Sequence, residues 1–338
     1  MSDPFHPYAY LYAEPSGPGD RRPTALQVVQ DNGALGQWTG KVVLVTGATS
    51  GIGVETARAL HATGADVYFT ARDLEKGAAV REDILKTSSG KGRLEVIHMN
   101  LDSLESVRKA AKDFLQKSNT LNVLINNAGI MATPFSKTTD GFERQFGVNH
   151  LAHFLLTSLL LPTLAASSTP DFNSRVVCVS SAAHRFSSVR LDDYNWDTPG
   201  AYEPFQGYGQ SKTANIWMAN YIDRMYGPRG GVHALSLHPG AIWSGLQDHM
   251  APEMMAEWKT NPDIRNMFQS PEQGAATSVW AAVGKVWEGK GGKYLTDCGV
   301  APLLKDATSA TDAGAAPHVH DKEGEDALWK LSERLVGV

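Results

Sequence analysis

Short apolar runs alternate with longer helical patterns over residues 41–244, and this alternation is the strongest pattern in the sequence. Nearly continuous apolarity is typical of strands that are covered on both faces. Strands separated by helix-length segments form parallel βαβ units. The pattern therefore predicts an α/β fold with a parallel sheet between two layers of helices. The expected strands are residues 42–45, 67–70, 94–97, 123–125, 176–179 and 234–237.

Helical patterns occupy the intervals between these strands and continue beyond the last one. The first helix is expected to begin at Gly51, and Ser103 is expected to cap the start of another. Further helices are expected over residues 24–30, 145–164 and 322–335, and around Tyr208 and Lys212. In the last of the numbered ranges, leucines recur at core spacing, so this helix should pack back on the domain.

Three parts follow from this reading. Residues 1–40 form an irregular extension rich in proline, glycine and tyrosine. Residues 41–300 form a large α/β domain with an insert at about 241–270, and residues 301–338 add a C-terminal loop and helix. The extension could wrap the body, cover a pocket or support a dimer contact, and the sequence leaves these three roles open.

The composition narrows the class of protein. The 338 residues carry 36 acidic and 31 basic side chains, a net charge of -5 that argues against a nucleic-acid partner. Two cysteines favour a reducing compartment, and residues 1–20 lack the basic start and apolar run of a secretory signal. The sequence shows no obvious apolar stretch of membrane-spanning length, so we expect a cytoplasmic protein without a membrane span.

A glycine-rich turn follows the first expected strand: Thr46-Gly-Ala-Thr-Ser-Gly-Ile-Gly53. Glycine takes positive φ readily, and the missing side chains let the backbone approach a pyrophosphate. The following helix would offer free N–H groups and the positive end of its dipole. The spacing G-x-x-x-G-x-G is a variant of the dinucleotide fingerprint, and an ordinary strand-to-helix turn is the alternative.

Arg72 stands at the end of the second expected strand, where the 2′ end of a dinucleotide is read. A guanidinium matches a 2′-phosphate, whereas Asp or Glu would bind a free hydroxyl. This residue therefore favours NADP(H) over NAD(H). A surface arginine, or one paired with Asp73, is the alternative.

Tyr208 and Lys212 are four residues apart, so on a helix they share a face. A free phenol has a pKa of about 10 and exchanges protons poorly near neutral pH. A neighbouring cation favours the phenolate, so we expect Lys212 to lower the pKa of Tyr208. Taken alone, this spacing also fits two exposed helix residues.

In order and separation, these motifs make the chain resemble the short-chain dehydrogenase/reductase family over about residues 40–300. The matching pieces are the glycine turn, Asn126-Asn-Ala-Gly129, Asn149, Ser180-Ser181, Tyr208 to Lys212, and His238-Pro-Gly240. The stretches 148–156 and 179–184 are similar to the branch of retinol dehydrogenases and WW-domain oxidoreductases, and to fungal metabolic reductases. The resemblance implies a Rossmann fold, doubly wound, with about seven parallel strands and helices on both faces.

The resemblance also assigns site residues. It implies Tyr208 as general acid/base, Lys212 as the group that holds the nicotinamide ribose, and Ser181 as the partner of the substrate oxygen, with Ser180 as the alternative. Asn149 would complete the catalytic tetrad. The implied cofactor-binding residues are Gly47, Thr49, Ser50, Gly51, Ile52, Gly53, Arg72, Asn100, Leu101, Asn127, Ala128, Gly129, Tyr208, Lys212, Pro239, Gly240, Ile242 and Ser244.

Two positions depart from the family pattern. Asn100 stands where an aspartate commonly meets the adenine, and Ser244 stands where a threonine commonly binds the carboxamide. Each keeps an oxygen that can serve the same purpose.

The function expected is NADP(H)-dependent interconversion of a carbonyl and an alcohol. Aromatic and methionine side chains after Ser181 and in the insert predict a bulky apolar or aromatic substrate of polyketide, terpenoid, steroid or retinoid type, as in secondary metabolism. The substrate-pocket candidates are Ser181, His184, Tyr202, Phe205, Trp243 and Met250. Core or subunit packing is the alternative for each aromatic residue.

Two rival functions remain: a nucleotide-binding relative that catalyses cyclisation, dehydration or epimerisation, and a non-catalytic redox-sensing or scaffold protein.

His150 and His153 are three apart on a helix, but no third ligand is evident, so we expect packing roles and no metal. The expected partner is a small apolar carbonyl or alcohol. By family analogy, assembly would be a homodimer or homotetramer.

Overall fold

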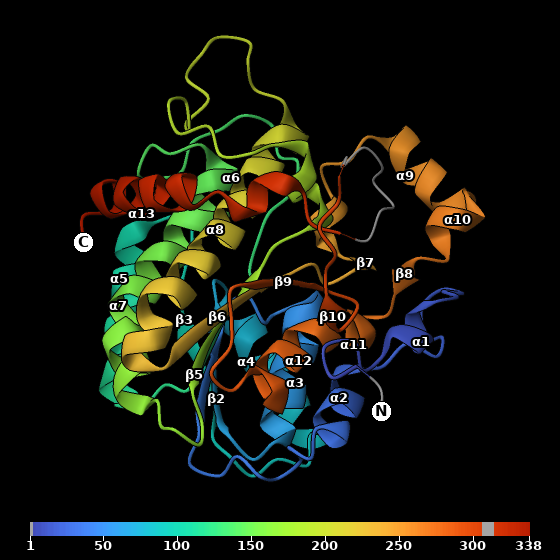
Figure 1. Ribbon diagram of the computed structural model, residues 1–338, viewed down its shortest axis with the longest axis vertical. Helices are drawn as coiled ribbons and strands as arrows, with labels where there is room; N and C mark the ends of the chain where they lie inside the picture. The colour runs from blue at the N-terminus through green and yellow to red at the C-terminus, as the bar shows by residue number, and fades with distance from the viewer. Residues whose placement is uncertain (1–2, 306–313) are drawn as a thin grey trace.

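The computed structural model describes residues 3–305 and 314–338, and it is built around a mixed sheet (Figure 1). The strand order is β10-β9-β6-β5-β4-β1-β2-β3, and every pairing is parallel except that of β10 with β9. The bounds are β1 Val42–Val45, β2 Asp66–Ala71, β3 Leu94–His98, β4 Val123–Asn126, β5 Ser174–Val179, β6 Val232–Leu237, β9 Lys293–Thr296 and β10 Gly299–Val300. The Rossmann-type doubly wound architecture is confirmed, with seven parallel strands and one short antiparallel strand.

Side chains alternate between the two faces of the sheet, as strand geometry requires. Val43 and Val45 belong to one apolar cluster, whereas Val42 and Leu44 belong to the other. The first face packs against α2 (Ala25–Asp31), α3 (Gly51–Ala62), α4 (Leu74–Thr87) and α12 (Ala276–Val283). The second packs against α5 (Leu104–Lys117), α7 (Ala152–Ser167) and α8 (Pro204–Gly230).

All six expected strands are confirmed, and five of them are one or two residues longer than the apolar runs. Ser103 caps α5 through its side-chain oxygen, as expected. Thr24, expected as the first residue of a helix, instead caps α2. Strand β9 was missed because only Tyr294 and Leu295 in it are apolar and buried. A further two-stranded pair, β7 (Ala241–Ile242) and β8 (Phe268–Gln269), was also missed because strands this short leave no periodicity.

The helix expected over 145–164 consists of three pieces: α6 (Arg144–Phe146), a π-helical turn at Gly147–Leu151, and α7. The continuous stretch Arg144–Ser167 is the one helix, within the described residues, that is long and apolar enough to cross a membrane. In this fold 61% of its most apolar window is buried, and its leucines pack against α5 and the sheet, as in a core helix.

Both ends of the chain pack on the α/β domain. The C-terminal helix α13 (Lys322–Val336) lies across α7 and α8, where Trp329 stacks on Tyr221 at 4.1 Å. The expectation that this helix packs back is therefore confirmed. Most of the loop expected before it, residues 306–313, lies outside the described residues.

The N-terminal extension wraps the body, which answers one question that the sequence left open. Helix α2 packs between α3 and α12 (Figure 1). Further towards the N-terminus, the Val300 N–H of β10 donates to the Phe5 carbonyl at 3.2 Å, and His6 Nε2 lies 2.9 Å from the Val300 carbonyl. The extension therefore follows the sheet edge and the helical layer beside it.

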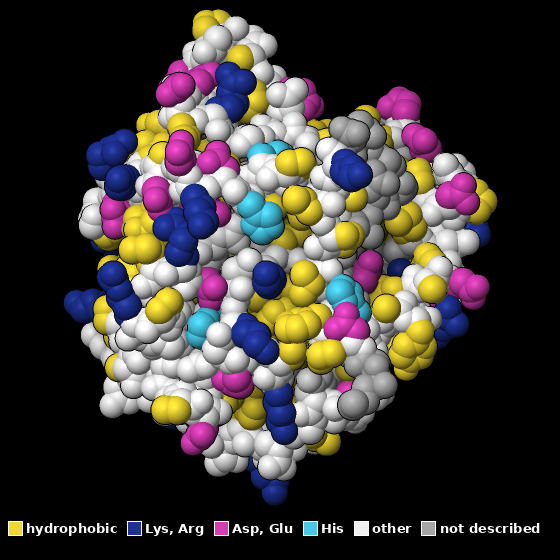
Figure 2. Space-filling view, in the orientation of Figure 1, with side chains coloured by type: hydrophobic (Ala, Val, Ile, Leu, Met, Phe, Trp, Pro, Cys, Tyr) yellow, Lys and Arg dark blue, Asp and Glu magenta, His cyan; other side chains and the backbone are white. Residues whose placement is uncertain are grey.

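On the face shown in Figure 2, acidic and basic side chains are interspersed rather than gathered by sign. This distribution agrees with the nearly balanced charge of the sequence.

Candidate active site

The candidate residues gather where the parallel strands end at their carboxyl side, as expected for ligand sites in open α/β sheets. Thr46 follows β1, Asn127 follows β4, Ser180 and Ser181 follow β5, and His238 follows β6. The topology therefore brings together motifs that lie almost 200 residues apart in the sequence.

The glycine turn between β1 and α3 has the backbone that the sequence predicts. Gly47 and Gly51 have φ values of +68° and +58°, which favour glycine. A Cβ atom on Gly47 would also collide with Ala128. Ser50, the N-cap of α3, makes no side-chain capping hydrogen bond, so N–H groups of the first turn are free for an anionic ligand.

The segment after β4 is tied to this turn. Thr46 Oγ1 accepts hydrogen bonds from the N–H groups of Asn127 and Ala128, at 2.9 and 3.0 Å. Asn127 Nδ2 donates to the carbonyls of Thr46 and Gly47. Asn127 Oδ1 is buried and lacks a hydrogen-bond partner in the described part of the chain, so it is available to a ligand. A glycine cradle, a free helix N-terminus and this oxygen together fit a dinucleotide.

The residues expected at the adenine end lie at the ends of β2 and β3. Arg72 is exposed, and its side chain has no hydrogen bond or ion pair within the described residues. Asp73, the alternative partner, instead caps α4 by accepting from Glu75 N and Lys76 N. Asn100 Oδ1 accepts from Asp102 N at 3.1 Å, so this oxygen already has a local partner.

The segment after β6 comes close to the same turn. A Cβ on Gly51 would lie 3.7 Å from Ser244 Cβ, and Ile242 lies close to Ile52 beside Gly274. Ser244 Oγ accepts from Leu246 N and so caps a short helical turn. The structure therefore places Ile242 and Ser244 beside the glycine turn, as the sequence assignment requires.

Tyr208 and Lys212 are both 3% exposed, on the face of α8 that meets the ends of β4 and β5. The Ser181 side chain lies near enough to the Tyr208 phenol to lower its pKa, which burial raises. The Ser180 hydroxyl instead donates to the Lys212 carbonyl at 2.8 Å. Of the two serines that the sequence offered, Ser181 is therefore the one that contacts the phenol.

Asn149 lies in the π-helical turn and connects this group to the segment after β4. It exchanges two hydrogen bonds of 2.9 Å with the backbone of Ile130, and Nδ2 also donates to Ser211 Oγ. A Cβ on Gly129 would lie 3.2 Å from both Asn149 Oδ1 and Lys212 Nζ. The glycine therefore leaves room for these two polar groups to approach the same backbone.

The expected effect of Lys212 on Tyr208 is not what the structure shows. Burial raises the pKa of Tyr208 to about 12, and the neighbouring Ser181 side chain only partly opposes this. Lys212 Nζ donates to the Val179 carbonyl at 3.1 Å and lies 5.5 Å from the centre of the Tyr208 ring. Desolvation of the phenolate thus dominates, and burial likewise lowers the pKa of Lys212 to about 8.

An apolar wall faces Tyr208. Phe205 and Met250 belong to it, as the sequence grouped them. The same cluster includes Met131, Ala132, Ala183, Leu246, Met254, Met255 and Trp258. Four methionine thioethers in a wall of this kind adapt to irregular apolar shapes.

Three other pocket candidates lie outside this cluster. His184 is fully buried: Nδ1 donates to the Ser181 carbonyl at 2.7 Å, and Nε2 accepts from Ala316 N. Trp243 stacks on Phe268 at 3.9 Å. Their side chains have partners elsewhere in the protein, so neither belongs to the cluster around Tyr208.

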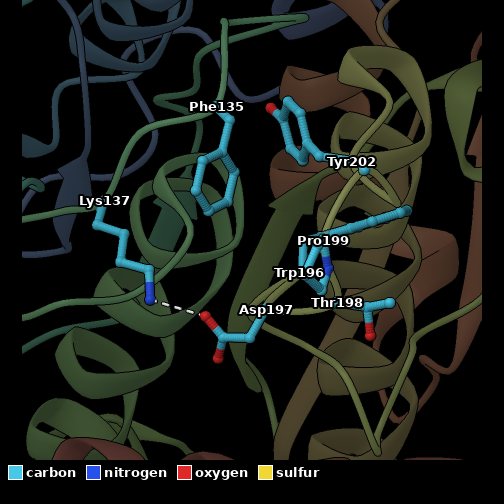
Figure 3. Close-up of a pocket in the computed structure, with 8 residues that line it drawn as sticks. Phe135, Lys137, Trp196, Asp197, Thr198, Pro199 and Tyr202 are labelled. Carbon is cyan, nitrogen blue, oxygen red and sulfur yellow. Dashed lines mark hydrogen bonds and ion pairs between the residues drawn. The ribbon is translucent and has the colours of Figure 1, made fainter.

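Tyr202 lines a hollow of about 340 Å³ between the segment that precedes α6 and the segment that precedes α8 (Figure 3). Its ring packs against Phe135 and Trp196, and its hydroxyl donates to the Thr133 carbonyl at 2.8 Å. Lys137 and Asp197 form an ion pair of 2.8 Å at the rim of this hollow. The structure thus separates Tyr202 from the cluster around Tyr208.

One functional link was missed from the sequence. His153 Nδ1 donates to the Asn149 carbonyl at 2.9 Å, and its Nε2 accepts from the Thr46 hydroxyl at 2.9 Å. The imidazole therefore joins the glycine turn to the turn that holds Asn149. The spacing of four residues between Asn149 and His153 was the available signal.

The other histidine of that pair has a packing contact. His150 Nε2 bonds to Ser332 Oγ of α13 at 2.9 Å. Within residues 3–305 and 314–338, no group of three or more His, Cys, Asp or Glu side chains is placed to hold a metal ion.

Comparison with known proteins places this geometry in context. Residues 41–195 match the family described as short chain dehydrogenase. The chain is 51% identical to short-chain dehydrogenase/reductase prx1 of Penicillium roqueforti, over 98% of this chain and 95% of that protein. It is 46% identical to oxidoreductase calI of Penicillium decumbens, over 98% and 97% of the two chains.

More distant relatives have the same fold. Human retinol dehydrogenase 11 is 41% identical over 89% of this chain and 87% of its own. A solved structure of an uncharacterized protein from Mycobacterium paratuberculosis has a TM-score of 0.67 and 32% identity, covering 91% of this chain and 97% of that one. The NADP active-site complex of Pseudomonas aeruginosa RhlG has a TM-score of 0.61 and 25% identity, covering 76% and 94%.

Proposed function

Because the chain belongs to the short-chain dehydrogenase/reductase family, a family of oxidoreductases, we propose that it uses NADP(H) to interconvert a ketone and an alcohol on a bulky apolar or aromatic molecule. The observation that carries this proposal is the buried Tyr208 phenol, which interacts with Ser181 and belongs to a methionine-rich apolar cluster.

Each part of the site has a role in this proposal. The N–H groups at the start of α3 and the glycine backbone would hold the pyrophosphate, and Asn127 Oδ1 would accept a hydrogen bond from the cofactor. Lys212 would donate to the ribose hydroxyls next to the nicotinamide. When bound, the dinucleotide supplies or accepts a hydride at its nicotinamide ring.

Ser181 and Tyr208 would act on the substrate oxygen. Both hydroxyls donate hydrogen bonds where negative charge develops during reduction. Burial, which raises the pKa of Tyr208 to about 12, keeps the phenol protonated near neutral pH, and a protonated phenol is the form that delivers a proton to the alkoxide. The site is therefore suited to the reduction of a carbonyl.

Two observations support the choice of cofactor and substrate class. Arg72 is exposed at the end of β2, with a guanidinium that matches a 2′-phosphate. Phe205, together with Met250 and other residues of the insert, packs next to the phenol in an apolar cluster. Relatives named as retinol dehydrogenases agree with a large apolar substrate.

The test is a panel of aromatic and polycyclic ketones, with small aliphatic ketones for comparison. Consumption of NADPH is followed by its absorbance and the products by mass spectrometry. We expect alcohol formed in equal amount to NADPH consumed, best with the bulky ketones, and a fall of about a thousandfold in turnover for Tyr208→Phe. Product without NADPH consumption would instead identify a non-redox reaction, and normal turnover of Tyr208→Phe would refute the role of the phenol.

A further inference from the structure

The segment between β7 and β8 contains two helices that are held weakly by their own contacts. These are α9 (Pro252–Thr260) and α10 (Pro262–Arg265), and neither contains a buried residue. In Figure 1 they project from the body beside the carboxyl ends of the strands. The middle of this segment, residues 243–267, packs through Met250, Met254, Met255 and Trp258 in the cluster around Tyr208, and its position depends also on how its two ends are fixed.

The returning end is fixed by Arg22 of the N-terminal extension. Its side chain is 3% exposed. Nη1 donates to the Met267 carbonyl at 2.8 Å. Nη2 donates to the Phe268 carbonyl at 2.6 Å and also approaches the carbonyls of Asn266 and Gly17, at 3.3 and 3.2 Å. One guanidinium thus contacts three successive backbone carbonyls at the end of the segment.

Arg22 is itself held in place from two directions. Its Nε donates to Asp20 Oδ1 at 2.9 Å, within a buried ion pair. Gln273 of α11 (Pro271–Gly274) donates to the carbonyls of Asp20 and Arg22, both at 3.0 Å. The planar guanidinium has five N–H donors in a fixed arrangement. It can therefore bind several neighbouring carbonyls at once, which a flexible ammonium does less well.

The residues that Arg22 fixes carry part of the wall of the candidate site. Phe268 is 1% exposed and stacks on Trp243 at 3.9 Å, and the Trp258 ring lies 5.9 Å from it. Trp258 packs in the same apolar cluster as Met250 and Tyr208. A connected series of contacts therefore runs from the extension, through β8, to the apolar cluster that contains the phenol.

We propose that Arg22 is a specificity-determining positioning residue: by binding the carbonyls of residues 266–268, it sets the position of the 243–267 segment against Tyr208 and so the size of substrate that the site accepts. This inference rests on the proposed function, because it assumes that the apolar wall binds the substrate. It gives the N-terminal extension a role in substrate selection, although no residue of the extension belongs to the apolar cluster around Tyr208.

The adjacent Arg21 offers a matched control. It is the same residue type, its side chain is 48% exposed, and it pairs with Glu14 at 3.5 Å. The test compares the full-length wild type with Arg22→Ala, Arg22→Lys and Arg21→Ala. The Arg22→Lys variant keeps the positive charge but lacks the planar set of guanidinium donors. It therefore serves as the test variant if the Arg22→Ala protein does not fold.

The first measurement is hydrogen–deuterium exchange of the free protein. We expect Arg22→Ala to exchange faster than the wild type over residues 243–269 and equally over β1, β4 and β5, with Arg22→Lys intermediate and Arg21→Ala unchanged. Wild-type exchange over 243–269 in both Arg22 variants would overturn the proposal. Faster exchange throughout the sheet would also overturn it, because it would show a general loss of stability.

The second measurement is steady-state kinetics with the bulkiest and the smallest ketone that the wild type reduces, together with the Kd of NADPH. We expect KM for the bulky ketone to rise about tenfold in Arg22→Ala, while KM for the small ketone and the Kd of NADPH change less than about twofold. Equal changes for both ketones would overturn the specificity role. If the wild type reduces no ketone, the proposed function fails, and the exchange data alone decide whether Arg22 positions the segment.

Discussion

Replacing Thr46 by valine tests whether the glycine turn and the Asn149 turn are held by one hydroxyl. Thr46 is fully buried, and valine has nearly the same shape. The hydroxyl accepts from the N–H groups of Asn127 and Ala128 and donates to His153 Nε2. The substitution therefore removes these interactions without opening a large cavity.

The expected loss of stability depends on which partners of the Thr46 hydroxyl keep another hydrogen bond. The Asn127 N–H keeps a second acceptor, the Ile125 carbonyl at 3.1 Å. The Ala128 N–H and His153 Nε2 have no other hydrogen-bond partner among the described residues. A buried polar group that loses its partner costs about 1–3 kcal/mol, so two of them give a loss of about 2–6 kcal/mol in the free energy of unfolding.

Urea unfolding followed by tryptophan fluorescence measures this loss, and the Kd of NADPH shows whether the turn has moved. Thr46→Ser is the matched control, because it keeps the hydroxyl and should lose less than about 1.5 kcal/mol. A Thr46→Val protein within about 0.5 kcal/mol of the wild type, with unchanged Kd, would refute the idea that this hydroxyl links the two turns.

Three further predictions concern charge, pH and packing. Arg72→Gln should raise KM for NADPH by about tenfold to a hundredfold and leave KM for NADH unchanged, as expected for the loss of a charge-assisted contact to phosphate; equal rises for both cofactors would contradict the assignment. Stability should fall as pH drops from about 6.5 toward 4, since burial lowers the pKa of several histidines to about 3 or 4 and the unfolded chain therefore binds more protons; each contributes up to about 1.4 kcal/mol per pH unit, and urea midpoints that do not change over this range would contradict it. These histidines are His150, His153, His184 and His238. Trp329→Ala should lower the free energy of unfolding by about 3–5 kcal/mol through loss of its packing on Tyr221 and Phe154, and a loss below about 1 kcal/mol in urea unfolding would show that α13 is not part of the cooperative core.

The fold was largely predictable because local patterns and topology agree. Each of the six apolar runs forms a strand. Because these strands are parallel, the motifs that follow them lie at the same edge of the sheet. The positions of Tyr208, Lys212, Ser181 and Asn149 near one another follow from this topology.

The remainder depended on tertiary contacts that no local pattern encodes. Placing a cation one helical turn from a phenol suggested a lowered pKa, but the outcome depends on burial, which raises the pKa of Tyr208 instead. Residue type alone placed His184 in the pocket, whereas its two ring nitrogens are used by Ser181 and Ala316 inside the protein. Arg22 had no distinguishing mark in the sequence, because its carbonyl partners lie almost 250 residues further along the chain.

The covering of β10 by the N-terminal segment affects how the protein behaves in concentrated solution. An outer strand with unpaired N–H and C=O groups is a template for the strand of another molecule, and this leads to aggregation. Here the Phe5 carbonyl and the His6 imidazole occupy the N–H and C=O of Val300. Proteolytic trimming of the first eight residues would uncover that template, so a nicked preparation should precipitate while the intact chain stays in solution.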